Sequence, residues 1–237
     1  MPDAPQPSPT PAAENDGLTI LGTPKRILRD ELHAIVSPAH VKPHDLRWII
    51  PVAAASAAGF ATDSYTMRNV VSHDTGFNNA SQTSSNALLG VAIGVPVALL
   101  GIGELKHQDH AREAGLLAGE AMVDAFILDE GIKYIFLRER PQTDNANGHF
   151  FTGNGVSNPS FVSGHSIVAW SSAAVLAGEY SRPWQQVGIY TLASGVSLTR
   201  VMGQEHFPTD AFLGAVSGWL IGHYVYGSHH RVHRSAP

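Results

Sequence analysis

The stretch ALLGVAIGVPVALLGIG, residues 87–103, has no charged side chain and is rich in the small residues Ala and Gly. A second run, LRWIIPVAAASAAGFAT at residues 46–62, is nearly uncharged. Both approach the roughly 20 apolar residues with which a helix crosses a membrane. Neither shows the apolar–polar alternation typical of a half-buried strand. Close-packed helices are therefore predicted around these two runs.

Outward from these runs, apolar residues recur at helical spacing in five more segments. These segments cover residues 24–36, 111–140, 164–180, 184–201 and 208–226. Polar residues 63–85 are predicted to form a loop or a short partner element, and the Gly- and Asn-rich residues 143–162 a loop. We therefore expect an all-α fold, a single helical bundle of about six main helices in residues 24–228. A flexible Pro/Ala-rich tail (1–23) and a polar tail (229–237) are expected at its ends.

The composition of the chain excludes several classes of function. Charged residues are only 15% of the 237 residues, and the formal net charge is -5, so nothing indicates a nucleic-acid partner. The chain contains no cysteine, which excludes disulfides and thiolate metal sites. The first residues carry neither a basic nor an apolar segment, so they are not expected to be a signal peptide.

Three separated fragments carry groups that suit one phosphate site. They are KYIFLRERP (133–141), SFVSGHS (160–166) and TRVMGQEHFPTD (199–210). Together they supply three permanent cations, a glycine amide, two imidazoles and a carboxylate. Such a set can hold a phosphoryl group and transfer it through a histidine.

These fragments resemble the three-part pattern of the type 2 phosphatidic acid phosphatase superfamily, which is K-x6-RP, PSGH and SR-x5-H-x3-D. That superfamily includes lipid phosphatases, class A acid phosphatases and vanadium haloperoxidases. The match covers residues 133–210, with two departures: Val162 stands where Pro is usual, and Thr199 where Ser is usual. Val162 leaves φ unfixed in the loop, whereas Thr199 keeps a hydroxyl.

The three cations are predicted to bind phosphate oxygens. Arg140 and Arg200 present planar forks, whereas Lys133 acts as a compact charge. Lys133 and Arg140 are seven residues apart, so on one helix they would share a face. Arg138 lies outside the pattern and is interpreted as a surface charge.

Ser163 and Gly164 precede an apolar helical stretch. Ser163 suits an N-cap, and Gly164 allows the backbone to approach an anion at a helix N-terminus. Both are assigned to phosphate binding. The resemblance implies that His165 is the general acid that protonates the leaving oxygen.

His206 and Asp210 are four residues apart, with Pro208 suited to a first helical turn. A carboxylate on one imidazole nitrogen would expose the other as a nucleophile. The resemblance assigns the nucleophile to His206, through a phosphohistidine intermediate, and Asp210 is expected to reach back to it.

The remaining polar residues are assigned no catalytic role. No metal site is predicted: the pair His107 and His110 and the group His229, His230 and His233 are interpreted as solvated surface. Glu120 and Asp124 are expected to pair with a basic residue on a neighbouring helix or to cap a polar layer. The side chains of His149, Phe150 and Phe151 could line a substrate entrance or plug the loop onto the bundle.

The leading hypothesis is a metal-independent phosphoric ester or diphosphate hydrolase, acting on a phosphorylated lipid. It needs no cofactor, and vanadate should inhibit it. A soluble acid phosphatase of broad specificity, acting on small phosphate esters, is the alternative. A haloperoxidase with vanadate as cofactor is a third. A location in a bacterial-type cell envelope, membrane-associated or periplasmic, fits the first two, while oligomeric state is left open.

Overall fold

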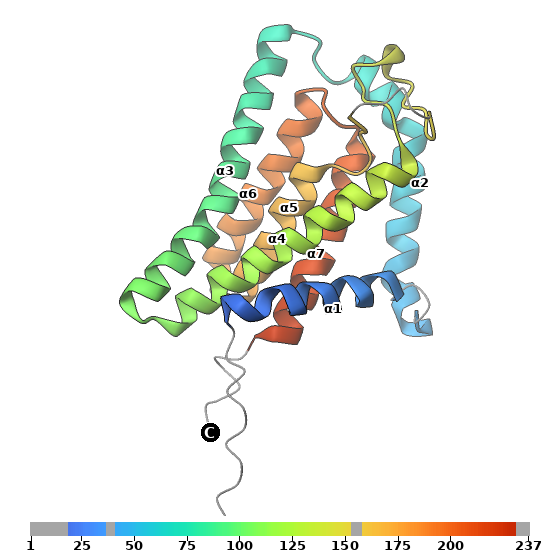
Figure 1. Cartoon of the computed structure of the whole chain (residues 1–237). Coiled ribbons are helices and arrows are strands. Elements are labelled where there is room, and N and C mark those ends of the chain that lie inside the picture. Colours follow the sequence, from blue (N-terminus) through green and yellow to red (C-terminus); the bar gives the residue numbers. More distant parts are fainter. Residues whose placement is uncertain (1–18, 37–40, 153–157, 231–237) are drawn as a thin grey trace, which may run out of the picture.

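The computed structural model describes residues 19–36, 41–152 and 158–230 (Figure 1). Within these ranges no β-strand occurs, so the prediction of an all-α fold is confirmed. The α-helices are α1 (Thr23–Val36), α2 (Leu46–Asn69), α3 (Thr75–Lys106), α4 (Asp109–Phe136), α5 (Gly164–Glu179), α6 (Pro183–Met202) and α7 (Pro208–His229). Short 3-10 turns lie at Ile20–Gly22, Pro43–Asp45 and Asp144–Ala146.

The helix α5 forms the centre of the bundle and packs against α4, α6 and α7 (Figure 1). The long helix α3 contacts α4 and α6, and α2 runs beside α7. The short helix α1 packs on α4 and crosses the bundle at the end where α7 finishes. The loop between α4 and α5 lies at the other end, together with the turn between α6 and α7.

Glycines explain how closely α5 and α7 approach each other. Gly214, Gly218 and Gly222 recur every four residues and form one face of α7. A Cβ at Gly218 would lie 2.2 Å from the carbonyl oxygen of Ile167, and a Cβ at Gly222 would lie 2.2 Å from that of Ser171. Any larger side chain would force the helices apart, so this face sets their spacing.

The predicted loop at residues 63–85 is wrong over most of its length. Helix α2 continues to Asn69, and α3 already begins at Thr75. Asp74 caps α3, since its side chain accepts a hydrogen bond from Phe77 N at 2.7 Å. The polar residues that follow use their side chains for helix contacts, for example Gln82, which donates to Gly203 O at 3.0 Å.

Two helix ends also differ from the prediction. Helix α4 stops at Phe136 because Leu137 adopts a left-handed conformation with φ 42°, so Lys133 and Arg140 do not share a helix face. Helix α7 continues to His229, inside the segment that was expected to be a tail. Residues 1–18 and 231–237 of the two predicted tails, including His233, lie outside the described residues.

Among the described residues, α3 alone is long and apolar enough to cross a membrane by length and composition. Only 17% of its most apolar 18-residue window is buried against the rest of the chain. A helix in the core of a water-soluble protein would bury most of such a window. The second apolar run, residues 46–62, belongs to α2, which does not meet the same criterion.

Candidate active site

The site assembles at the end of the bundle where α4 finishes and α5 and α7 begin (Figure 1). Lys133 lies in the last turn of α4, and Arg140 follows in the segment after it. His165 is in the first turn of α5, Arg200 is in the last turn of α6, and His206 is in the turn before α7. The same three cations, Arg200, Arg140 and Lys133, act electrostatically on both imidazoles. The structure therefore brings these five side chains together.

Each of the three cations already pairs with a carboxylate. Lys133 Nζ lies 2.6 Å from Asp129 Oδ2. Arg140 and Arg200 share one oxygen of Glu205, with Arg200 Nη2 at 3.2 Å. Lys133 Nζ also lies 3.4 Å from Glu130 Oε1, but 49% of the Glu130 side chain is exposed, so solvent screens this pair and positive charge remains for an anion. Neither Asp129 nor Glu205 was assigned to the site from the sequence.

His206 is buried, with 2% of its surface exposed. Its Nδ1 lies 2.7 Å from the carbonyl oxygen of Ser160. Because a carbonyl can only accept, Nδ1 carries the proton and Nε2 keeps its lone pair. Burial, reinforced by Arg140 and Arg200, holds the pKa of His206 well below its ordinary value of 6.5. The ring therefore stays neutral in mildly acidic solution.

Asp210 has other partners than the predicted one. Its carboxylate accepts hydrogen bonds from Ser160 Oγ at 2.5 Å, from Arg138 Nη1 at 2.5 Å and from Phe207 N at 3.1 Å. The expected direct contact with His206 is replaced by Ser160, whose carbonyl holds the ring and whose hydroxyl binds Asp210. The carboxylate thus acts on the orientation of the imidazole through Ser160.

Arg138 was interpreted as a surface charge, and this is wrong. Its side chain is 3% exposed and forms ion pairs with Asp210 at 2.5 Å and Asp63 at 2.8 Å. Its guanidinium also lies 4.0 Å from the centre of the Phe207 ring. Asp63 in turn accepts from both the backbone and the hydroxyl of Thr209. This network locks the start of α7 to α2 directly behind His206.

The first turn of α5 holds the second motif. Ser163 caps the helix and is buried, with its hydroxyl bonded to Ser166 Oγ at 3.1 Å. At Gly164 a Cβ would lie 2.6 Å from Asp129 Oδ2 and 3.1 Å from Lys133 Nζ, so a side chain at this position would displace the Lys133–Asp129 ion pair. His165 Nε2 lies 2.9 Å from Asn86 Oδ1 of α3, a partner that the sequence did not indicate.

The two departures from the family pattern lie away from the charged groups. Val162 is 2% exposed and packs with Ala125 and Ile167, and the peptide bond that precedes it is cis. The hydroxyl of Thr199 donates to Gly195 O at 2.7 Å within its own helix. Both residues serve local structure.

The loop after α4 covers the region beside Arg138. Phe150 packs edge-on against Phe60 and Phe161, with ring centres 5.7 and 5.6 Å apart. This ring therefore anchors the loop to the bundle, as one of the two interpretations held. Phe151 and His149 remain exposed, and His149 Nε2 lies 3.4 Å from Asp144 Oδ2.

Comparisons with known proteins bear on the family and the fold. A family model described as the PAP2 superfamily matches residues 114–234, just over half of the chain and including all three fragments. The lipid A 1-phosphatase of Porphyromonas gingivalis is 28% identical in an alignment of 198 residues that covers 79% of this chain. The alignment covers 40% of that protein, so the chain spans about two fifths of the relative's length.

A solved structure shares the architecture. It is that of the first transmembrane PAP2 type phosphatidylglycerolphosphate phosphatase from Bacillus subtilis. The TM-score is 0.50 at 19% sequence identity, and the alignment covers 91% of this chain and 100% of that one. At this identity the likeness shows the fold.

Proposed function

Because the chain belongs to the PAP2 superfamily, we propose that it is a phosphatase that hydrolyses a phosphomonoester or diphosphate of a lipid through a phosphohistidine. The observation that carries the proposal is the state of His206. Its ring is buried and neutral, Ser160 O binds its Nδ1, and three cations surround it. Nε2 is then the nitrogen that can attack phosphorus.

In the first step, His206 Nε2 forms a bond to phosphorus while the bond from phosphorus to the leaving oxygen breaks. His165 gives its proton to that oxygen, so the alcohol or phosphate departs in its protonated form. Lys133, Arg140 and Arg200 stabilise the negative charge on the equatorial oxygens. These side chains supply the positive charge that the reaction needs, so a metal ion has no required part in it.

In the second step, a water molecule attacks the phosphohistidine. His165, now neutral, takes a proton from this water, while the N–P bond breaks and its electrons return to His206. Asp210 and Ser160 keep the imidazole oriented through both steps. Inorganic phosphate leaves, and the site regains its starting protonation.

The apolar outer surface of the bundle favours a membrane location and therefore a lipid substrate. Apolar side chains are exposed along several helices: Val91, Ile93, Val95 and Val97 on α3, Val123, Phe126 and Ile127 on α4, Leu198 on α6, and Phe212 and Leu220 on α7. An apolar surface of this extent marks a membrane or protein contact. We therefore place α3 in a bilayer of the cell envelope, which favours a lipid over a small soluble ester.

The test is a phosphate-release panel on the purified chain. Lipid A with a 1-phosphate, phosphatidylglycerol phosphate, phosphatidic acid and an isoprenoid diphosphate are compared with soluble phosphate esters, with and without detergent micelles. The expected result is micelle-dependent release from one of the lipids that continues in EDTA and stops with vanadate. Turnover of soluble esters alone would identify the soluble acid phosphatase instead, and halide oxidation with vanadate and peroxide would identify the haloperoxidase.

A further inference from the structure

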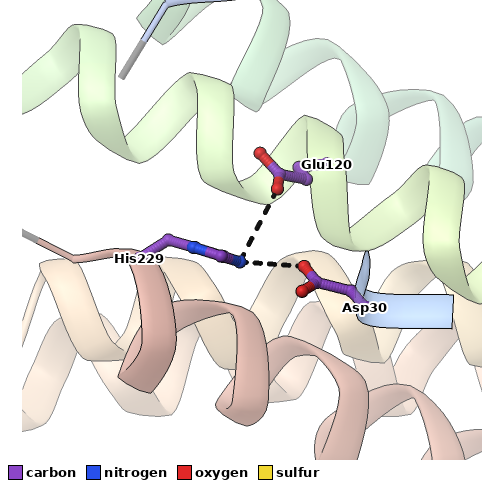
Figure 2. A group of neighbouring side chains, drawn as sticks. All are labelled: Asp30, Glu120 and His229. Carbon is purple, nitrogen blue, oxygen red and sulfur yellow. Dashed lines mark hydrogen bonds and ion pairs between the residues drawn. The ribbon is translucent and has the colours of Figure 1, made fainter. Parts of the chain in front are cut away.

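A second buried cluster of charged side chains lies at the other end of α7 (Figure 2). It joins Asp30 from α1, Glu120 from α4 and His229 from α7, and these three side chains point toward one another. His229 Nε2 lies 2.8 Å from Asp30 Oδ2 and 3.8 Å from Glu120 Oε1. All three residues are buried, at 4%, 1% and 3% exposure respectively. The interpretation of His229 as solvated surface is therefore wrong.

The spacing of these atoms suits a metal ion. Ligands held about 2.0–2.1 Å from a tetrahedral Zn²⁺ lie about 3.3 Å from one another. The two distances from His229 Nε2, 2.8 and 3.8 Å, lie on either side of that value. One potential ligand atom from each of the three residues lies within 4.8 Å of the other two. Small side-chain shifts would thus place all three atoms on one ion.

Two carboxylates of this region have buried oxygens that accept no hydrogen bond. They are Asp30 Oδ1 and both oxygens of Asp124, which is 4% exposed. The nearest cation to Asp30 Oδ1 is Arg29 Nε, at 3.9 Å. Asp124 follows Glu120 by one turn on the same face of α4. Buried carboxylate oxygens without a partner are costly, so they indicate a missing positive group.

The cations already present do not balance the cluster. Arg26 binds Glu120 with its Nε and Nη2, at 2.8–3.0 Å, and only 13% of its side chain is exposed. Arg29 lies 3.4 Å from His229 Nδ1, but 65% of its side chain is exposed, so it can turn to solvent. Three buried carboxylates therefore face one guanidinium that is largely shielded from solvent, that of Arg26. Each carboxylate oxygen has more than one lone pair, so Glu120 can keep Arg26 and still bind an ion.

We propose that Asp30, Glu120 and His229 bind one divalent transition-metal ion, with Zn²⁺ as the reference species, that fastens α1 to α4 and α7. One imidazole with two carboxylates is a donor set that Zn²⁺ accepts. The ion is structural, since the cluster lies near the end of α7 opposite the phosphate site (Figure 1).

The test uses the full chain in detergent, freed of metal with a chelator and dialysed. Zn²⁺ is titrated in competition with a chromophoric chelator, and bound metal is counted by elemental analysis. We expect one tightly bound Zn²⁺ per chain, a rise in melting temperature, and Co²⁺ absorption bands typical of a tetrahedral site. In His229→Gln and in the isosteric Asp30→Asn, affinity should fall at least 100-fold.

The matched control is His223→Gln, an exposed histidine on the same helix that stacks on Trp219. It should bind Zn²⁺ within twofold of the unchanged chain. If the His229 variant does not fold, Asp30→Asn carries the test. Absence of stoichiometric binding, or binding that both variants leave unchanged, would overturn the proposal. The cluster would then be a network in which Asp124 is neutral.

Discussion

The two ends of α7 bury histidines among neighbours of opposite charge. His206, just before the helix, lies near Arg140, Arg200 and Lys133, whereas His229, in its last turn, contacts Asp30 and Glu120. About 30 Å of helix separates them. One end is suited to bind an anion and the other a cation.

The difference shows that the role of a histidine here depends on what other helices bring to it. The neighbours of His206 come from the last turn of α4, the segment after it and α6, and those of His229 come from α1 and α4. At the first end a backbone carbonyl fixes the ring, so that one nitrogen is available for reaction. At the second end the Asp30 and Glu120 carboxylates lie beside the ring, so its Nε2 can bind a metal ion together with them.

The largest effect on activity is expected at the end of α7 that carries His206. His206→Ala removes the proposed nucleophile, so kcat should fall about 10⁴-fold or more, as it does when nucleophiles of other hydrolases are removed. The measurement is phosphate release from the best lipid of the panel. His223→Gln, exposed on the same helix, should keep full activity. A His206→Ala variant with undiminished kcat would eliminate the phosphohistidine.

The next effect concerns stability behind the site. Arg138→Met leaves Asp63 and Asp210 buried without their shared cation, so the free energy of unfolding should fall by about 3–5 kcal/mol. Chemical denaturation in detergent measures this loss. Arg47→Met, at an exposed position of α2, should change the free energy by less than about 0.5 kcal/mol. Equal losses in the two variants would contradict the role given to Arg138.

A gain in anion affinity is expected when Glu205 loses its charge. Glu205 occupies the guanidinium groups of Arg140 and Arg200 and also accepts from Gln142 at 3.1 Å. Glu205→Gln should therefore lower the inhibition constant of vanadate about tenfold, which corresponds to about 1.4 kcal/mol.

The control for this change is Glu130→Gln, a half-exposed carboxylate 3.4 Å from Lys133. It should alter vanadate inhibition less than twofold, because an exposed ion pair contributes little. Weaker binding of vanadate by the Glu205 variant would show that Glu205 orders the two arginines instead of competing with the phosphate.

The helices were predictable from the sequence because they depend on local patterns. The apolar runs, Ser163 before α5 and Pro208 in the first turn of α7 all indicated elements that the structure contains. The start of α3 was missed although Asp74 is a good N-cap residue. The burial of His229 could also have been predicted from the sequence. Gly218, Gly222, Val225 and His229 are spaced by four and three residues, which places them on one face of α7.

The partners within the site were not predictable in the same way. Arg138 looks like any charged residue near a helix end, and its partner Asp63 precedes it by 75 positions. The contact of His206 with Ser160 O depends on the path of the loop before α5, which spacing does not encode. Fragments with fixed spacing indicated the chemical groups, whereas the tertiary fold decides which of them meet.

A smaller effect on kcat/KM is expected when the pH of the assay is changed. For an imidazole with the ordinary pKa of about 6.5, the neutral fraction falls about fivefold between pH 6.5 and pH 5.5. Because the pKa of His206 is well below that value, its neutral form is nearly constant over this range. Burial and Arg200 lower the pKa of His165 to about 4, so its proton-donating form also increases as the pH falls over this interval. After correction for substrate ionisation, which 31P NMR measures separately, kcat/KM should therefore not fall between pH 6.5 and 5.5. A fivefold fall would contradict the neutral, cation-surrounded state of His206.

The smallest effect is expected at Thr199, where the chain departs from the family pattern without touching the charged groups. Its hydroxyl donates to Gly195 O and Val196 O of its own helix, at 2.7 and 3.0 Å, and serine can make the same bonds. Thr199→Ser should therefore change kcat and KM less than twofold, as measured with the same lipid substrate. A larger change would mean that the hydroxyl or the methyl group at this position reaches the phosphate through Arg200, its neighbour in the chain. The position of the Arg200 side chain would then be set by packing inside α6 as well as by its ion pair with Glu205.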